Sequence, residues 1–412
     1  MTREENELLT RVGPGTACGR LMRRYWQPAA LSEELSHGGP PQPVRLLAED
    51  LVLFRDGEGR PGLLGLHCSH RGADLSYGRV EDGGLRCIYH GWLYDRSGRC
   101  LDQPGEPHGG EHKGSIRHLA YPCREQAGII FAYMGPGEPP LLPNYEFLTV
   151  PENHRVVTKL FSDCNYLQGN EGNYDLIHLS FLHQSKPRNG RLSGRGTAPG
   201  VETLDAELTD FGVRVCKMRE AESNQYLYVG TFILPSFFAF PGKVSGNGYS
   251  VNWHVPIDDT HHWKYRFSFY RERPLDDEMI RRGRVEGDIT PDYKPVRNKT
   301  NRYKQDRSSM KEETYSGIGF VFPAQDLCVT EGPGPIQDRT REHLVSSDLP
   351  LVVARKVQLK AIQDVQEGRE APYVVRDPRL NRFPYVFAFE GVASGSTHWK
   401  EYLKQLDAEM KA

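Results

Sequence analysis

The sequence has no apolar run that approaches the ~18 residues needed to span a membrane. It also has no excess of one charge, since 52 Lys and Arg balance 54 Asp and Glu and leave a net charge of −2 over 412 residues. That balance gives no bulk attraction to nucleic acid or to a membrane surface. No internal repeat or low-complexity tract is present, and the length suits about two or three globular domains.

Two further absences concern cofactors and compartment. No Gly-x-Gly-x-x-Gly follows a predicted strand, so the sequence indicates no dinucleotide site of its own. The polar residues 1–7 do not resemble a secretory signal, and the eight cysteines form no paired framework. Two cysteines lie in a motif shared with histidine, and the other six are scattered: Cys18, Cys100, Cys123, Cys164, Cys216 and Cys328. We therefore expect a reducing, cytoplasmic location.

The mixed motif is the strongest chemical signal in the chain. It reads Cys68-x-His70, sixteen intervening residues, then Cys87-x-x-His90, so that each of two loops supplies one Cys and one His. A Rieske [2Fe–2S] cluster needs this set, because two Cys hold one iron and two His hold the other. A structural zinc site accepts the same residue types, but its sequences usually pair Cys with Cys and His with His. Glycines beside both loops let backbone N–H groups approach the cluster sulfurs, which favours the Rieske interpretation.

A second candidate metal site lies between residues 170 and 183. Helical spacing would place Glu171, Asp175 and His178 on one face, while His183 is rotated off that face unless the helix ends or bends near Ser180. Two imidazoles and one carboxylate form the facial triad of non-haem Fe(II), which leaves positions open for O2. The alternative is two histidines satisfied by local hydrogen bonds. Asp175 suits a supporting role, accepting the His178 ring N–H. Spacing does not choose the carboxylate ligand, and the candidates are Asp175, Asp326, Glu331 and Asp338.

The pattern along the chain predicts an α+β protein of two domains. Residues 4–24 have a helical pattern broken at 13–15, and residues 44–66 contain short apolar runs typical of strands. A last strand over 127–133 is followed by a Pro/Gly cluster, which marks a boundary. We predict an N-terminal helical segment over 1–24, an all-β cluster domain over 25–135 and a catalytic domain over 136–412. In the latter, the sequence indicates long strands at 226–234 and 262–270, a surface loop at 186–200 and a C-terminal helix at 344–367.

Several residues of the second half are candidates for a substrate pocket. The aromatic-rich stretch 232–240 and Trp253 could line an apolar pocket, although ordinary sheet core is the more common role for such residues. A carboxylated substrate would need a cation in the pocket. The candidates are Arg195, Arg214, Lys217 and Arg266, each of which could equally be a solvated charge. The basic stretch 281–307 is predicted as a lid, a reductase-facing surface or a solvated loop.

With these motifs in view, the chain resembles the oxygenase component of the Rieske non-haem iron ring-hydroxylating oxygenases. It is most similar to the phthalate 4,5-dioxygenase-like group, which also contains O-demethylases of methoxylated aromatics. The likeness runs from residues 11–26 through the cluster loops to residues 334–344, and Glu171-x3-Asp175-x2-His178-x4-His183 matches the iron motif of the family. The chain lacks the extra cysteines that respiratory Rieske proteins pair as a disulfide, which favours a low-potential cluster.

The resemblance implies a fold and a set of ligands. It implies a β-sandwich Rieske domain joined to a helix-grip catalytic domain, a curved antiparallel sheet around a long helix. Cys68, His70, Cys87 and His90 would bind the cluster, and His178, His183 and Asp326 would bind Fe(II). Asp175 would bridge His178 to His90 of the partner subunit in a homotrimer or a stack of two trimers.

The predicted function is that of a terminal oxygenase. It would use O2 and electrons from a separate NAD(P)H-dependent reductase to hydroxylate an aromatic compound, with an aromatic acid favoured. The alternative within the family is oxidative O-demethylation of a methoxylated, lignin-derived aromatic acid. Two other classes are an electron carrier that uses the cluster alone and a zinc-stabilised interaction module. The carrier would leave His178, His183 and over half the chain without a role.

Overall fold

A computed structural model gives the fold and describes residues 1–107, 110–186, 202–221, 223–244, 246–383, 387–395 and 397–411. The chain forms two compact units, one of Val12–Leu142 and one of Met1–Arg11 with Pro143–Ala412. The described part holds no helix that is both long and apolar enough to cross a bilayer. The predicted surface loop at 186–200 lies, except for its first residue, outside the described residues.

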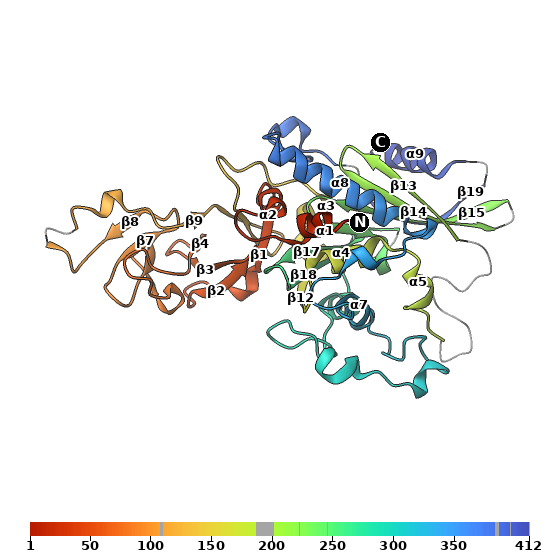
Figure 1. Ribbon diagram of the computed structural model, residues 1–412, viewed down its shortest axis with the longest axis horizontal. Coiled ribbons are helices and arrows are strands. Elements are labelled where there is room, and N and C mark those ends of the chain that lie inside the picture. Colours follow the sequence, from red (N-terminus) through yellow and green to blue (C-terminus); the bar gives the residue numbers. More distant parts are fainter. Residues whose placement is uncertain are drawn as a thin grey trace. The chain divides into compact units, whose positions relative to one another are not determined.

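The smaller unit is built from short antiparallel strands in three sheets (Figure 1). The first sheet has the order β1-β11-β10, the second β2-β3-β4-β9 and the third β5-β6-β7-β8. The strands are β1 (Trp26–Leu31), β2 (Gln42–Leu46), β3 (Glu49–Arg55), β4 (Pro61–Gly65), β5 (Arg79–Glu81), β6 (Gly84–Arg86), β7 (Leu93–Asp95), β8 (Cys100–Asp102), β9 (Ala120–Tyr121), β10 (Cys123–Gln126) and β11 (Ile129–Tyr133). The apolar runs of residues 44–66 therefore form β2 to β4, as the sequence predicts.

The core of this unit fixes the loops that follow β4 and β6. Val52, Phe54 and Leu64 pack in one buried cluster with Cys68 and Cys87. β11 begins at Ile129 rather than at residue 127, because Ala127 and Gly128 both have positive φ and make the turn from β10. Both cysteines of the two loops thus belong to the buried core of this unit.

The larger unit is organised around one antiparallel sheet of eight strands (Figure 1). The order is β12-β18-β17-β16-β15-β14-β13, and β19 also pairs with β15. The strands are β12 (Arg155–Ser162), β13 (Glu202–Thr209), β14 (Gly212–Ala221), β15 (Asn224–Ile233), β16 (Phe237–Phe240), β17 (Ser250–Pro256), β18 (His262–Phe269) and β19 (Phe389–Ser394). Along β17 and β18, alternate residues share one face, so that His254 lies opposite Lys264, Asn252 opposite Arg266 and Ser250 opposite Ser268.

Helices pack against this sheet and against each other. α4 packs on β17 and α7, and α8 packs on β13 and α1. The helices are α1 (Arg3–Thr10), α2 (Ala17–Met22), α3 (Glu146–Thr149), α4 (Tyr166–Tyr174), α5 (His178–Phe181), α6 (Asp277–Arg284), α7 (Phe322–Glu331), α8 (Leu349–Gln366) and α9 (Trp399–Lys411). Short 3-10 helices are Ser32–Glu34, Leu75–Tyr77, Lys113–Ser115, Glu152–His154, Gly242–Val244, Lys299–Lys304, Ser308–Met310, Arg339–Arg341, Ser346–Asp348 and Pro378–Leu380.

The predicted fold class is confirmed, and two helical details differ from the prediction. The C-terminal helix begins at Leu349 instead of residue 344, with a proline in its first turn, where the missing N–H costs nothing. A further helix, α9, follows β19 and was not predicted. The two compact units also divide the predicted segment 1–24, since α1 belongs to the larger unit and α2 to the smaller one. Their border falls at Leu142 and Pro143, just beyond the Pro/Gly cluster.

Candidate metal centres

The two Cys/His loops of the smaller unit have the same backbone hydrogen bonds. Cys68 N–H donates to the Ala73 carbonyl and Gly72 N–H donates back to the Cys68 carbonyl, at 2.9 and 2.8 Å. In the second loop, Cys87 N–H donates to the carbonyl of Trp92 at 2.9 Å, and Gly91 N–H donates to that of Cys87 at 3.0 Å. Gly72 and Gly91 have φ of 73° and 75°, a region that favours glycine. The spacing in sequence thus produces a pair of matching loops.

The side chains of these loops converge. The Cys68 and Cys87 side chains are buried, and the nearby Cys87 thiol helps to raise the pKa of Cys68. Burial raises the pKa of the Cys68 thiol, while the Tyr94 hydroxyl, 3.2 Å from its sulfur, opposes that shift. The His70 and His90 rings lie 4.5 Å apart between centroids, and His70 also stacks on an indole ring at 4.5 Å.

This arrangement fits a [2Fe–2S] group held by two thiolates and two imidazoles. The His70 Nδ1 atom is buried and has no hydrogen-bond partner in the described part of the chain. An imidazole nitrogen that is buried without a partner is costly in a protein unless a metal occupies it. Burial likewise makes the Cys68 thiol costly to ionise, and a bound metal removes that cost.

The histidines of the larger unit follow a break in the helix. α4 ends at Tyr174, and Asp175 has extended backbone angles, so His178 begins the separate short helix α5. The predicted single helical face for Glu171, Asp175 and His178 is therefore wrong. The Asp175 carboxylate accepts from the backbone N–H groups of Ile177 and His178, at 3.1 and 3.4 Å, and this cap favours the break.

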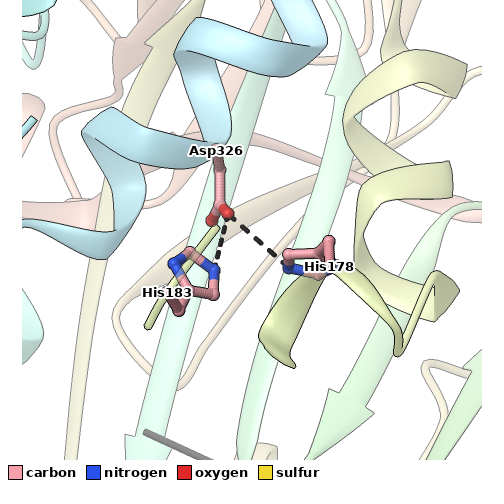
Figure 2. Close-up of side chains that lie close together, drawn as sticks. All are labelled: His178, His183 and Asp326. Carbon is pink, nitrogen blue, oxygen red and sulfur yellow. Dashed lines mark ion pairs between the residues drawn. The ribbon is translucent and has the colours of Figure 1, made fainter. Parts of the chain in front are cut away.

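Asp326 of α7 completes a compact group with the two histidines. Its Oδ1 atom lies 3.0 Å from His183 Nε2 and 3.9 Å from His178 Nε2, and one ligand atom from each of the three residues lies within 4.8 Å of the others. Figure 2 shows both imidazoles turned toward the carboxylate. Three atoms bound facially at ~2.1 Å from one ion lie ~3 Å apart. The group therefore has the residue types and nearly the spacing of a non-haem iron triad.

Hydrogen bonds on the far side of each ring leave both Nε2 atoms free for a metal. His178 donates from Nδ1 to the backbone carbonyl of Asp175. His183 donates from Nδ1 to Gln325 Oε1 at 2.6 Å, because the Gln325 amide nitrogen donates to the Gly319 carbonyl. The acceptor for His178 is thus the main-chain oxygen of Asp175, whereas the sequence suggested that the Asp175 carboxylate would accept this N–H; that detail of the prediction is wrong, because the carboxylate caps the next backbone N–H groups.

The Asp326 carboxylate is held in its charged form. Burial alone would raise its pKa, but Lys264 and the two histidines keep the pKa well below the usual range. Lys264 Nζ lies 3.4 Å from Asp326 Oδ2, on the side opposite the oxygen that faces His183. Burial opposes protonation of both imidazoles. It lowers the pKa of His178, whereas the adjacent carboxylate outweighs it at His183 and raises that pKa.

The other carboxylate candidates have structural partners. Glu331 accepts from the Tyr303 hydroxyl and from the Asp163 backbone N–H, the latter at 3.0 Å. Asp338 caps the 3-10 helix Arg339–Arg341. Glu171 receives hydrogen bonds from two buried arginines, Arg339 and Arg355. Among the described residues, only Asp326 of the four candidates joins His178 and His183.

A cavity of about 1220 Å³ opens onto this group. His178, His183 and Asp326 all line it, together with the aromatic side chains Tyr226, Tyr228, Phe238, Phe240, Phe267, Phe320 and Phe322. Residues 281–283 and 285–288 also line it, so part of the predicted basic stretch is cavity wall. The remaining aromatic residues of the stretch 232–240, Phe232 and Phe237, are buried at 0% and 1% exposure, and Trp253 is buried at 3%, as sheet core.

The candidate cations differ in their surroundings. Arg266 lines the cavity, whereas Lys217 is paired with Glu202 at 3.1 Å and Arg214 lies 3.9 Å from Glu207. Arg195 lies outside the described residues. Sequence reasoning missed Lys264 and Gln325, and the only signal for Gln325 is its position next to Asp326.

Comparison with known proteins agrees with both centres. Residues 25–120 match the family described as Rieske [2Fe-2S] domain, and residues 132–411 match LigXa C-terminal domain like. The chain is 35% identical to the phthalate 4,5-dioxygenase oxygenase subunit of Pseudomonas putida, over 98% of this chain and 94% of that protein. It is 32% identical to the 5,5'-dehydrodivanillate O-demethylase oxygenase subunit of a Sphingobium species, over 98% and 93%.

A solved structure supports the same fold. The oxygenase of carbazole 1,9a-dioxygenase, in complex with ferredoxin, matches with a TM-score of 0.59 at 20% identity, over 88% of this chain and 96% of that one. The protein therefore belongs to the Rieske non-haem iron oxygenases, as an oxidoreductase and oxygenase component that carries a Rieske [2Fe–2S] cluster and a mononuclear iron centre.

Proposed function

We propose that the chain is the terminal oxygenase for an aromatic acid, which binds with its carboxylate on Arg266 and its ring beside His178, His183 and Asp326. Cys68, His70, Cys87 and His90 would hold the cluster, and the two histidines with Asp326 would hold the iron. When bound, the cluster supplies single electrons and the iron is where O2 is reduced. The observation that carries the substrate class is the charge of Arg266 inside the cavity.

Arg266 is a cation without a salt bridge in the described part of the chain. Its one hydrogen bond runs from Nη1 to the Gly283 carbonyl, at 3.2 Å. Burial lowers its pKa to about 10, which still leaves the guanidinium charged at neutral pH. Of the other cations that line the cavity, Lys264 pairs with Asp326 and Arg282 with Glu278, whereas Arg219 and Arg281 have no ion pair among the described residues. A guanidinium with free donors in a partly apolar cavity favours an anionic ligand, and a carboxylate matches its planar fork.

The position of Arg266 suits an aromatic acid. On β18 it lies two residues from Lys264, which pairs with Asp326, so the two cations are separated by ~6.6 Å along one face of the strand. That separation is close to the length of a benzoate. Aromatic side chains of the cavity wall, among them Phe238 and Phe240, give the ring apolar surface to stack on and exclude water from it.

The residues around the proposed iron site have distinct roles. His178 and His183 present Nε2 atoms of fixed tautomer, and Lys264 keeps the Asp326 carboxylate charged and oriented. Hydroxylation consumes one O2, two electrons and two protons, and gives one hydroxyl group and one water. Removal of a methyl group from a methoxy substituent also consumes one O2, two electrons and two protons, and gives the free phenol, formaldehyde and water. Because a relative at 32% identity is an O-demethylase, demethylation of a methoxylated aromatic acid is the second candidate.

The electrons would come from a separate NAD(P)H-dependent reductase or through a ferredoxin, since the sequence contains no dinucleotide motif after a strand. We further propose a cytoplasmic homotrimer, or two stacked trimers, in which Asp175 connects His178 with His90 of the partner subunit. We also propose that the chain is divided into an N-terminal segment 1–24, a cluster domain 25–135 and a catalytic domain 136–412.

The test measures binding and turnover on the holoenzyme with a surrogate reductase. Benzoate and benzamide are titrated calorimetrically, and oxygen uptake and products are measured across benzoates, phthalates and methoxybenzoates. Arg266→Leu should weaken benzoate binding about 30-fold or more, because it removes a charge-assisted pair, and should leave benzamide binding unchanged. Arg282→Leu is the matched control, since that arginine is already paired with Glu278. Equal benzoate affinity in wild type and Arg266→Leu would overturn the proposal.

A further inference from the structure

A chain of side-chain hydrogen bonds runs from the cavity wall into the interior of the larger unit. It begins at Asn252 on β17, passes through Asn173 at the end of α4, and continues through the buried rings of His254 and His262. It ends on the backbone carbonyl of Cys164. Asn252 and Asn173 line the cavity, and the two histidines are 1% and 0% exposed. None of these residues has a role in the iron triad.

The interior end of this series of hydrogen bonds fixes which atom donates in each bond. A carbonyl oxygen only accepts, so His262 must donate from Nδ1 to Cys164, at 2.8 Å. Burial lowers the pKa of His262 to about 4 and that of His254 well below its usual value, so both rings are neutral. The Nε2 atom of His262 is then an acceptor, and His254 donates to it from Nδ1 at 2.9 Å. This leaves His254 Nε2 as an acceptor toward Asn173.

The Asn173 amide is fixed at two points. Its nitrogen donates to His254 Nε2 at 2.7 Å and to the Gly169 carbonyl at 3.4 Å, and neither partner can donate in return. Its oxygen therefore faces Asn252, which donates to it from Nδ2 at 2.8 Å. The packing leaves little room for rearrangement, because a Cβ atom at Gly169 would come within 2.6 Å of both imidazoles.

The consequence appears at the cavity surface. With its amide nitrogen committed to Asn173, Asn252 turns its carbonyl oxygen away from that partner. Asn252 is 8% exposed and lines the cavity, and within the described residues no other group hydrogen-bonds to it. Across the β17–β18 ladder it lies directly opposite Arg266. The cavity thus presents an acceptor of fixed orientation beside the cation to which we assign the carboxylate.

We infer that Asn252 Oδ1 is a specificity site for a hydrogen-bond donor on the substrate ring, so that the enzyme prefers aromatic acids that carry a free hydroxyl group. The inference rests on the proposed function, because Arg266 must place the carboxylate next to Asn252. A methoxy group at the same ring position has no proton to donate and meets the lone pairs of Asn252 instead. An acceptor that cannot reorient discriminates between the two, because rotating it would break bonds along the whole chain.

The test compares matched ligands on the iron-loaded holoenzyme. Dissociation constants are measured for benzoate, 3- and 4-hydroxybenzoate, and 3- and 4-methoxybenzoate. In at least one of the two series, we expect the hydroxyl compound to bind about tenfold more tightly than its methoxy counterpart, the amount that one additional hydrogen bond contributes. Asn252→Leu should abolish the preference while benzoate affinity changes little. Ser250→Ala, two residues along the same strand, should keep it, since the Ser250 hydroxyl already pairs with Ser268 at 2.9 Å.

The outcomes distinguish a failure of this inference from a failure of the proposed function on which it rests. No preference in either series for the wild-type protein would show that the chain of hydrogen bonds is structural only, and would overturn the inference without any variant. A preference that persists in Asn252→Leu, with iron content and cluster absorbance of the variant intact, would overturn the assignment to Asn252. If benzoate itself does not bind, or binds without Arg266, the proposed function fails instead.

Discussion

Replacing Glu171 by glutamine should destabilise the larger unit strongly. Arg339 donates to this carboxylate at 3.0 and 2.7 Å, and Arg355 donates to it at 2.6 Å. The side chains of Arg339 and Glu171 are only 0% and 7% exposed, and no other carboxylate among the described residues pairs with Arg339. Removing one partner of a buried ion pair costs about 3–5 kcal/mol, because the remaining charge stays desolvated.

The effect has a defined pH dependence. Burial would raise the pKa of Glu171, but the two guanidinium groups overcome it and hold the pKa below its ordinary value. A group with a lowered folded pKa stabilises the protein fully above its unfolded pKa, about 4.3 for Glu. That stabilisation is lost as the pH falls through the folded pKa. The difference between wild type and Glu171→Gln should therefore be constant from pH 6 to 8 and shrink below about pH 4.3.

Differential scanning calorimetry of the holoprotein measures this prediction. A loss of 3–5 kcal/mol corresponds to about 6–20 °C in the melting temperature of the larger unit. Glu342→Gln is the control, because the single ion-pair partner of Glu342 within the described residues is Arg355, which keeps Glu171; the melting temperature of this variant should fall less. A change of less than about 2 °C for Glu171→Gln at pH 7 would refute the reasoning, as would a difference that does not diminish in acid.

Three further predictions concern the two metal centres. Asp175→Asn should keep both metals, since an amide oxygen can still cap Ile177 N–H. If Asp175 connects the two centres as proposed, the change should nearly abolish turnover, and normal turnover with unchanged iron content would contradict the proposal. Lys264→Met should raise the iron dissociation constant about 10–100-fold, because Asp326 loses the cation that orients it. Chelator competition measures this constant, with His178→Ala, which lacks one iron ligand, as the reference. Tyr94→Phe should make the reduction potential of the cluster more negative in a redox titration, because a hydrogen bond to the Cys68 sulfur stabilises the reduced form; an unchanged or more positive potential would contradict it.

Local spacing explains how much of this protein could be predicted. The Cys68/His70 and Cys87/His90 loops are each shorter than six residues, and their glycines dictate the turns, so residue order alone specifies the geometry. The same holds for the strands of residues 44–66 and for the break at residues 13–15, where apolar alternation and Pro/Gly signals act over a few residues.

Sequence spacing gave a wrong prediction where a single capping interaction determines the backbone conformation. The residues from Glu171 to His178 fit one helical face, but the Asp175 carboxylate binds the N–H groups of the next residues and ends the helix. Helical periodicity does not register that competition, because Asp is nearly neutral in a helix and strongly favourable as a cap.

The sequence by itself determined which residue types can bind metal and that two different iron centres are present. Only the tertiary structure decided which carboxylate, cation and amide meet them. His183 and Gln325 are 142 residues apart, and Lys264, Arg266 and Asn252 reach the cavity through the register of β17 and β18. The physical reason is that charge pairing and hydrogen-bond direction depend on burial and on partners distant in sequence, which the chain acquires only when the sheet is assembled.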